Sequence, residues 1–246
     1  MTIAEQIINL ALKQNGQFTR QDILSSVDSD VKLKSEGSLA VLLNRMIAES
    51  KIVRIAYGTY RLNENLKHKF LYEPNGFILN INKQIKENFP FIEYCIWQPS
   101  VMVSMMQHVP AAKMTLIDVE RDAMESVFLF LQGIGFGIPV ILNPTKELAE
   151  RYITNQEVIV IRPLVKEAPL ETVNGCPVPT LEKMLVDSVS DKELQHLQGN
   201  ELYHIFSNAF ANYEIKKTRL FRYASRRNRK DKVEQIIESV ENDTSR

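Results

Sequence analysis

Four charged residues in the middle of the chain are of the types that a Mg²⁺-dependent phosphodiester-cleaving site would use. Asp118 and Glu120 lie at the end of an expected strand, with Glu93 upstream and Lys113 nearby. Carboxylates can hold Mg²⁺, and a lysine beside them can stabilise an attacked phosphate. Such a site would place the lysine just after the second acid, whereas here it precedes both acids. We therefore favour a structural role, in which the two acids begin the following helix at its positive end.

Other chemical motifs are weaker still. The glycines of GIGFG (133–137) lack GxGxxG spacing and follow an expected helix, which predicts a helix stop and loop. The four histidines form no HExxH-like pair, and Cys95 and Cys176 have no CxxC spacing. The sequence thus predicts no catalytic residue, no metal, no cofactor and no enzymatic activity.

The composition is that of a water-soluble globular protein. The chain has 246 residues, of which 44% are hydrophobic and 24% are charged. No apolar run approaches the roughly 18–20 residues that span a membrane, and the start of the chain lacks the features of a secretory signal. Two unpaired cysteines suit a reducing compartment. We expect a cytoplasmic protein with no membrane partner.

Charge is unevenly distributed although the formal net charge is zero. Residues 1–66 carry eight Lys/Arg against seven Asp/Glu, and residues 67–215 carry twelve against eighteen. Residues 216–232 carry nine basic residues against one acidic residue, a net charge of +8. A basic segment on an acidic body favours contact with nucleic acid or with an acidic partner, although a solvated helix face is the simpler interpretation.

The first 66 residues have the pattern of three helices followed by a β-hairpin. Helical periodicity covers residues 2–14, 20–26 and 36–49, and residues 50–62 (SKIVRIAYGTYRL) predict two short strands around a Tyr57-Gly58 turn. This order is typical of a winged helix-turn-helix domain, in which the third helix enters the major groove of DNA. Such a domain can also serve protein contacts alone.

The exposed positions of these elements predict the DNA contacts. The third helix would present polar side chains to base edges, and the hairpin would contact phosphates or the minor groove. The predicted DNA-binding residues are Ser38, Asn44, Arg45, Arg54, Tyr57, Thr59 and Arg61.

A second, larger domain follows a linker at 67–80, where Pro74-Asn75-Gly76 predicts a turn. Strands expected at 91–97, 112–119, 139–143 and 157–164 alternate with helices, which favours a small α/β sheet. Helices follow to the end, the last running from about 218 to 240. The predicted fold is α+β with two domains: a winged helix-turn-helix at 1–66 and an α/β domain at 81–246 with a helical, basic tail.

The basic tail supplies the second set of candidate residues, for contact with phosphate or an acidic protein. These are Lys216, Lys217, Arg219, Arg222, Arg226, Arg227, Arg229 and Lys230.

With these pieces in place, the chain resembles the AbiEi-type antitoxins of bacterial toxin–antitoxin systems. The resemblance rests on the hairpin SKIVRIAYGTYRL, on PTLEKMLVDS (179–188) and on RYASRRNR (222–229). It implies an abortive-infection regulator whose winged domain binds inverted repeats in its own promoter. It further implies that the C-terminal domain counters a nucleotidyltransferase-like toxin. A DNA-targeted nuclease and a winged-helix protein-interaction module remain the alternatives, and a monomer and a dimer are equally compatible with the sequence.

Overall fold

The protein has a mixed α+β fold that divides into two compact units. The computed structural model describes residues 2–26, 36–63, 67–108, 113–153, 156–197 and 199–244. One unit comprises residues 1–71 with 212–214, and the other comprises residues 72–211 with 215–246.

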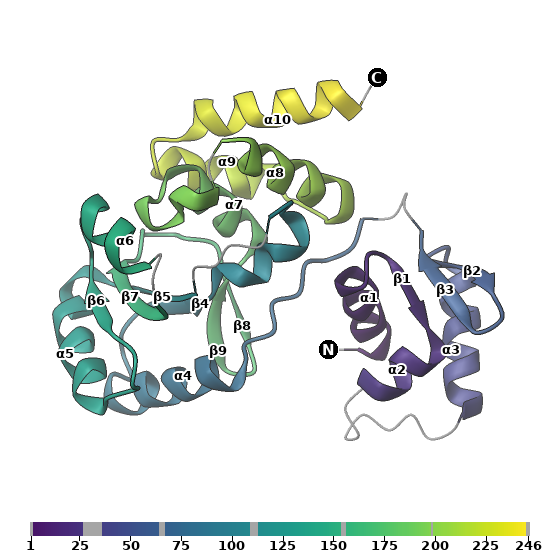
Figure 1. Cartoon of the computed structure of the whole chain (residues 1–246), viewed down its shortest axis with the longest axis horizontal. Coiled ribbons are helices and arrows are strands. Elements are labelled where there is room, and N and C mark those ends of the chain that lie inside the picture. Colours follow the sequence, from purple (N-terminus) through teal and green to yellow (C-terminus); the bar gives the residue numbers. More distant parts are fainter. Residues whose placement is uncertain are drawn as a thin grey trace. The chain divides into compact units, whose positions relative to one another are not determined.

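The first unit contains helices packed on a small antiparallel sheet of strand order β1-β3-β2 (Figure 1). Its elements are α1 (Ile3–Lys13), β1 (Gln17–Thr19), α2 (Arg20–Ser26), α3 (Glu36–Ala48), β2 (Ile52–Ala56) and β3 (Thr59–Leu62). The sequence predicts all of these except β1, whose three residues are too few to show a strand period. A capping box between Thr2 and Glu5 begins α1, and Gly58 takes the positive φ of 69° that the tight hairpin turn requires.

Apolar side chains from every element build the core of this unit. Phe18 of β1 is 1% exposed, and its ring stacks on that of Tyr60 in β3 with 5.7 Å between centroids. Helix α3 contributes Leu39, Leu43 and Met46 to the same cluster. Because β1 is so short, its place in the sheet depends on this one aromatic pair as well as on its backbone hydrogen bonds.

The second unit is built on a four-stranded sheet of order β4-β5-β7-β6. Its strands are β4 (Tyr94–Trp97), β5 (Met114–Val119), β6 (Val140–Leu142) and β7 (Val158–Pro163). Strands β5, β7 and β6 are parallel, and β4 is antiparallel to β5. All six residues of β5 are buried, as expected for a central strand covered on both faces.

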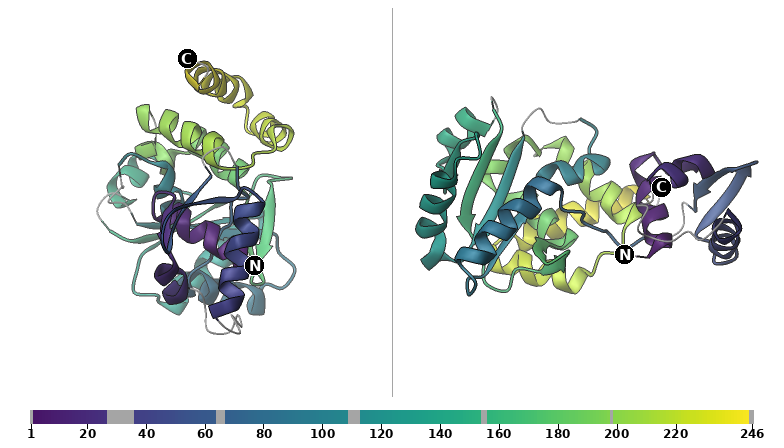
Figure 2. Two further views of the ribbon diagram at one scale, coloured as in Figure 1. Left: turned by 90° about the vertical axis from the view of Figure 1, so that its right-hand side faces the viewer. Right: turned by 90° about the horizontal axis from the view of Figure 1, so that it is seen from below.

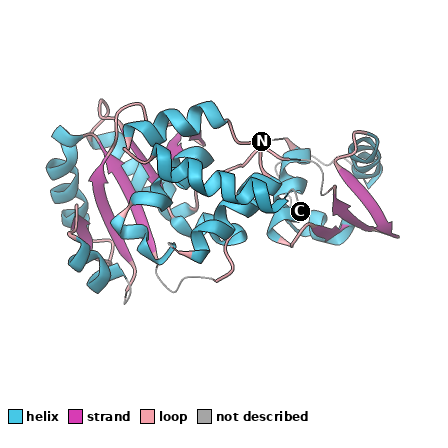
Figure 3. Ribbon diagram, turned by 90° about the horizontal axis from the view of Figure 1, so that it is seen from above, coloured by secondary structure: helices cyan, strands magenta, loops and turns pink. Residues whose placement is uncertain are grey.

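Helices cover both faces of this sheet. Helices α4 and α5 lie together on one face, where the rings of Phe89 and Phe130 meet at 5.3 Å, and α7 with the other C-terminal helices lies on the opposite face (Figures 1, 2 and 3). The α-helices of this unit are α4 (Gly76–Asn88), α5 (Met124–Ile134), α6 (Lys146–Ile153), α7 (Leu181–Ser190), α8 (Asn200–Asn212), α9 (Lys217–Arg226) and α10 (Lys230–Thr244). Short 3₁₀ helices η1 (Pro99–Met105), η2 (Arg121–Ala123) and η3 (Lys192–Leu197) and a hairpin of β8 (Leu170–Val173) and β9 (Cys176–Pro179) complete it.

Two sequence predictions about this unit are wrong in detail, and one element was not predicted. The linker predicted at 67–80 ends in helix, because the Asn75 side chain accepts a hydrogen bond from the Ile78 amide and begins α4 at Gly76. The single tail helix predicted at 218–240 is two helices, separated where Asn228 takes a φ of 52°. The β8–β9 hairpin was not predicted, although the Asn174-Gly175 pair at its turn, with both φ angles positive, is a local hairpin signal.

The expected helix stop at GIGFG is confirmed, because Gly135 ends α5 with a φ of 72°. Within the described residues, no helix is both long and apolar enough to cross a bilayer.

The aromatic pair predicts a large effect of truncating Phe18. Phe18→Ala should destabilise the first unit by about 3–5 kcal/mol, because it leaves a cavity and removes the contact that holds β1. Hydrogen exchange of the amides in α1 and α3 would report this loss. The chain has a single tryptophan, Trp97, which lies in the second unit, so the denaturant transition followed by its fluorescence should not move.

Tyr57→Ala serves as the matched control, because the Tyr57 side chain is 94% exposed. The free energy of opening calculated from the exchange rates should change by less than about 0.5 kcal/mol. Equal protection in Phe18→Ala and in the unmodified chain would contradict the role given to the aromatic pair.

Candidate functional site

Two regions of the molecule gather polar side chains in an organised way: an exposed face of the first unit and a buried charge network in the second. The exposed face begins with α3, whose Ser38, Val41, Asn44, Arg45 and Ala48 are all exposed. Leu39, Leu43 and Met46 on the opposite side anchor the helix in the core. Val41 is 70% exposed, so an apolar side chain also lies on the outward face.

The residues of α3 that are predicted to contact DNA bases lie on two parts of this face. Ser38 and Arg45 line a groove of about 470 Å³ between α3 and the start of α1, and the Arg45 Nε donates to Glu49 Oε1 at 2.7 Å. Asn44 and Val41 are exposed but are not part of that groove. Asn44 is therefore the polar side chain best placed at the centre of the outward face, with Arg45 at its edge.

The hairpin supplies the rest of the exposed face. Tyr57 at the turn is almost fully exposed, and the Arg54 guanidinium lies 5.4 Å from the centre of its ring. A bulge between Arg54 and Ala56 interrupts the pairing of β2 with β3. Arg61 is exposed on β3, whereas Thr59 is only half-exposed because its backbone pairs with both neighbouring strands.

The second region starts from the register of the four-stranded sheet. Cys95 of β4, Asp118 of β5 and Arg162 of β7 are direct neighbours across three strands. Residues directly opposite each other project to the same side of a sheet, so an acid and a base meet in an otherwise apolar core. Asp118 is 2% exposed and Arg162 is 5% exposed.

Arg162 is the centre of this buried network. Its Nε donates to Asp118 Oδ1, its Nη2 donates to Asp187 Oδ2 at 3.0 Å, and its Nη1 donates to Asp191 Oδ2 at 2.5 Å. The three carboxyl groups come from β5, from α7 and from the residue after α7. One guanidinium therefore ties the sheet to the helical layer.

Lys183 adds a second buried cation beside the first. Its Nζ donates to Asp118 Oδ2 and, at 2.6 Å, to Asp187 Oδ2 one helical turn further along α7. Asp187 also accepts from the Tyr223 hydroxyl of α9 at 2.9 Å. The indole ring of Trp97 lies within 6 Å of both the Arg162 guanidinium and the Lys183 ammonium group.

Burial and charge act in opposite directions on two acids of the network. Burial by itself would raise the pKa of Asp118, but the charges of Arg162 and Lys183 outweigh it and hold that pKa well below its usual range. For Asp191, burial dominates over Arg162 and raises its pKa to about 6, with Asp187 as a further cause. The ion pairs of the network join four carboxyl groups to four cations; its members are Asp118, Asp187, Asp191, Glu193, Arg162, Lys183, Lys192 and Arg227.

The network overturns one sequence prediction. Asp118 does not begin a helix, because it lies inside β5 with both carboxylate oxygens occupied by Arg162 and Lys183. Glu120 does precede η2, as predicted, and its backbone amide donates to the Glu93 carbonyl. Lys113 is exposed at the start of the strand. The four candidate nuclease residues are thus not joined in one site, and no His, Cys, Asp or Glu group suited to a metal occurs in the described part of the chain.

The basic tail is divided between internal pairs and the surface. Arg227, predicted as a contact residue, instead turns inward to Asp191 and to the Ser190 hydroxyl, and Arg219 lies 3.6 Å from Glu182. Lys217 and Arg226 form surface pairs with Glu241 and Glu167. The exposed residues of the predicted set are Lys216, Lys217, Arg222, Arg226, Arg229 and Lys230.

The sequence did contain a signal for the network residues that were not predicted. Arg162 is the single charge inside the apolar run VIVIRP, and Lys183 and Asp187 are spaced four apart in a helix whose first nine residues are all buried. A charge inside a continuous apolar segment implies a buried partner. Its partner could not be identified, because the pairs join residues 25 to 65 positions apart.

A family model matches residues 38–243, from within α3 to the end of α10. The chain belongs to DUF6577, a family of unknown function. The match spans the hairpin and the whole charge network of the DUF6577 chain, and it leaves α1, β1 and α2 outside. A search of curated proteins found no match.

The geometry predicts that Lys183 is required for the stability of the second unit. Lys183→Met should lower the free energy of unfolding by about 3–5 kcal/mol, because it leaves Asp118 and Asp187 with one cation between them. Trp97 fluorescence during denaturant unfolding reports the change directly. In the control Lys217→Met, loss of an exposed pair should change the same transition by less than about 1 kcal/mol. Equal effects of the two substitutions would show that the buried lysine has no special role.

The pKa of Asp191 predicts an unusual dependence of stability on pH. The folded chain holds this proton up to about pH 6, whereas the unfolded chain releases it near pH 3.8. The folded state therefore binds more protons in this window, and the free energy of unfolding should fall as the pH rises from 4 to 6. Asp118 has the opposite sign, since its stabilising contribution is lost as the pH falls below about 4.

Asp191→Asn should abolish the decline in the free energy of unfolding between pH 4 and pH 6, measured by urea unfolding at constant salt. Asp231→Asn, which removes an exposed carboxylate, should keep it. A decline of the same slope in Asp191→Asn would assign it to another group.

Proposed function

We propose that this protein is a DNA-binding transcriptional autorepressor and the antitoxin of a bacterial toxin–antitoxin pair, acting without catalysis. Its first unit is a winged helix-turn-helix domain that binds inverted repeats in promoter DNA. Its second unit counters a nucleotidyltransferase-like toxin. We further expect it to act in the cytoplasm.

The observation that carries the DNA-binding half is the arrangement of α3 and the β2–β3 hairpin. The helix is held by a buried apolar side and turns Val41, Asn44 and Arg45 outward, while the next element is a projecting ribbon with Arg54 and Arg61. A helix of this kind fits the major groove, and an arginine-bearing ribbon fits the adjacent backbone or minor groove.

The exposed side chains suggest separate roles at the DNA. Asn44 can pair with the N6 and N7 atoms of adenine, and Val41 can pack on a thymine methyl group. Arg54 and Arg61 would contact phosphates, which give affinity without sequence information. Because residues 1–66 are near neutral in charge, binding of inverted repeats by two copies would provide affinity that one copy lacks.

The antitoxin half rests on the resemblance to AbiEi-type antitoxins. Two of the pieces that carry that resemblance meet in the buried network, where Lys183 and Asp187 come from PTLEKMLVDS and Tyr223 and Arg227 come from RYASRRNR. Because side chains of both segments contact each other in one buried network, a chain that contains one segment also requires the other. This supports a common fold core, on which a toxin-binding surface would be built.

A protein-interaction module is the second candidate, and the hairpin favours it in one respect. Val53 and Ile55 of β2 are 49% and 41% exposed, which is unusual for β-branched residues of an edge strand unless a partner covers them. The nuclease alternative has less support, since the oxygens of Asp118 already bind two cations.

A mobility-shift titration on the DNA upstream of the gene tests the first role. Arg61→Ala should weaken binding at every sequence and reduce the slope of log K against log salt by about one, because one phosphate contact is lost. Asn44→Ala should instead reduce discrimination against a mutated half-site, with the salt slope unchanged.

Lys86→Ala in α4 is the charge-matched control and should leave both quantities unchanged, because Lys86 is exposed in the other unit. Unaltered affinity in Arg61→Ala and Asn44→Ala, or no binding at low salt, would rule out the DNA role and favour the interaction module.

The antitoxin role has its own test. A neighbouring gene for a nucleotidyltransferase-like protein is expected, and its expression alone should arrest growth. Co-expression of the full chain should restore growth, also with Asn44→Ala and Arg61→Ala, since neutralisation belongs to the second unit. Absence of such a neighbour, or continued arrest, would contradict this half of the proposal.

A further inference from the structure

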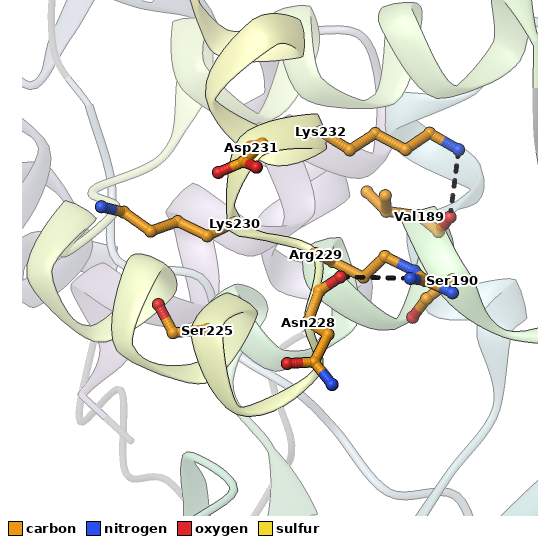
Figure 4. A pocket seen from close by; sticks show the side chains of 8 residues that line it. All are labelled: Val189, Ser190, Ser225, Asn228, Arg229, Lys230, Asp231 and Lys232. Atoms are coloured by element: carbon orange, nitrogen blue, oxygen red, sulfur yellow. Dashed lines mark hydrogen bonds between the residues drawn. The ribbon is translucent and has the colours of Figure 1, made fainter.

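A concave, strongly polar cleft lies at the corner where α9 ends and α10 begins (Figure 4). Its volume is about 710 Å³. The end of α7 forms one wall, and the α9–α10 connection with the first turn of α10 forms the other. The lining residues are Val189, Ser190, Ser225, Asn228, Arg229, Lys230, Asp231 and Lys232.

Two cations of this cleft are not neutralised by acids. Arg229 Nη1 donates to the backbone carbonyl of Asn228 at 3.1 Å, and Lys232 Nζ lies 3.5 Å from the carbonyl of Val189. Among the described residues, neither side chain takes part in an ion pair, whereas nearby Arg226 and Arg227 each bind a carboxylate. Their charge is therefore directed to solvent and to whatever occupies the cleft.

The remaining wall residues add polar groups around these cations. The amide of Asn228 can donate to a ligand, whereas the hydroxyls of Ser190 and Ser225 already donate to the Val186 and Phe221 carbonyls and make the wall polar. Lys230 lies 3.4 Å from the half-buried Glu234 and adds a third, partly compensated cation. The single carboxylate of the lining, Asp231, opposes them, so the cleft keeps a net positive charge.

One wall of the cleft is held by the buried network. Arg227 donates to the Ser190 hydroxyl at 3.2 Å and pairs with Asp191 of the network. The left-handed conformation of Asn228 then turns the chain so that α10 starts beside α7. The position of Ser190 relative to Arg229 is thus set before any ligand binds, which lowers the entropy cost of binding.

We propose that this cleft is a binding site for a compact phosphorylated ligand of the nucleoside triphosphate class, held through its phosphate groups. Its volume lies within the roughly 300–1,000 Å³ of small-molecule sites. Its lining has cations and the Asn228 amide for phosphate oxygens but a single apolar residue, Val189, and no aromatic ring for a base. The polyphosphate is therefore recognised, and the base is left largely in solvent.

Calorimetric titration of the full chain with ATP and with inorganic tripolyphosphate at about 100 mM salt tests this site. Both probes should bind, with affinities within about tenfold of each other, since the phosphates carry the recognition. Arg229→Gln combined with Lys232→Gln should weaken both by at least about a hundredfold, because two charge-assisted contacts are lost. Arg229→Lys combined with Lys232→Arg should retain binding to within about tenfold, because the charge is kept.

Arg222→Gln combined with Arg226→Gln removes the same charge from the exposed face of α9 outside the cleft. It should weaken binding by less than about threefold, an effect of general electrostatics. Equal weakening by the two charge-removing pairs, or no binding of either probe at 1 mM, would overturn the proposal. So would binding of a short DNA duplex that depends on Arg229 and Lys232 without any binding of tripolyphosphate. None of these measurements depends on the DNA-binding role of the first unit.

Discussion

The structure of the second unit depends on the burial of one guanidinium group. Arg162 lies inside a parallel strand at 5% exposure, where an unpaired positive charge would cost several kcal/mol. Its charge is compensated by carboxyl groups from β5, from α7 and from Asp191. Any packing of the helical layer that moved these acids away would leave the charge unpaired. The network therefore specifies how α7 sits on the sheet more sharply than apolar contacts could, since apolar surfaces tolerate sliding.

The same constraint organises the C-terminal helices. Lys183 fills the space between Asp118 and Asp187, the Tyr223 hydroxyl binds Asp187, and Arg227 binds Asp191. Helix α9 is thereby docked on α7 by polar contacts, and the corner between α9 and α10 is placed beside Ser190. The first unit is built differently: its core is apolar and aromatic, and the polar side chains of α3 lie on its exposed side. The central charges of the second unit's network are buried and fix the packing of its helices, whereas the arginine side chains of α3 and the hairpin in the first unit are exposed.

This division changes how the basic segment 216–232 is understood. Nine cations in seventeen residues suggest one continuous contact surface. In the folded chain, Arg227 lies in the interior network, Arg219 faces Glu182, and Lys217 and Arg226 pair on the surface. Among the described residues, Lys216, Arg222, Arg229 and Lys232 take part in no ion pair, and the last two lie together at one concave corner. The number of basic residues in the segment thus overestimates the extent of the basic surface, and it does not indicate where the cleft lies.

The sequence by itself determined the elements whose signals are local. The apolar stripe of α3, the glycine turn of the hairpin and the alternation of strands and helices each depend on residues a few positions apart. It did not determine the role of Asp118 or the short strand β1. Their causes are pairs such as Asp118 with Lys183 and Phe18 with Tyr60, which join positions 65 and 42 residues apart. Only the tertiary structure could identify these pairs. A buried charge requires a partner of opposite charge, but the sequence does not specify which distant residue supplies it.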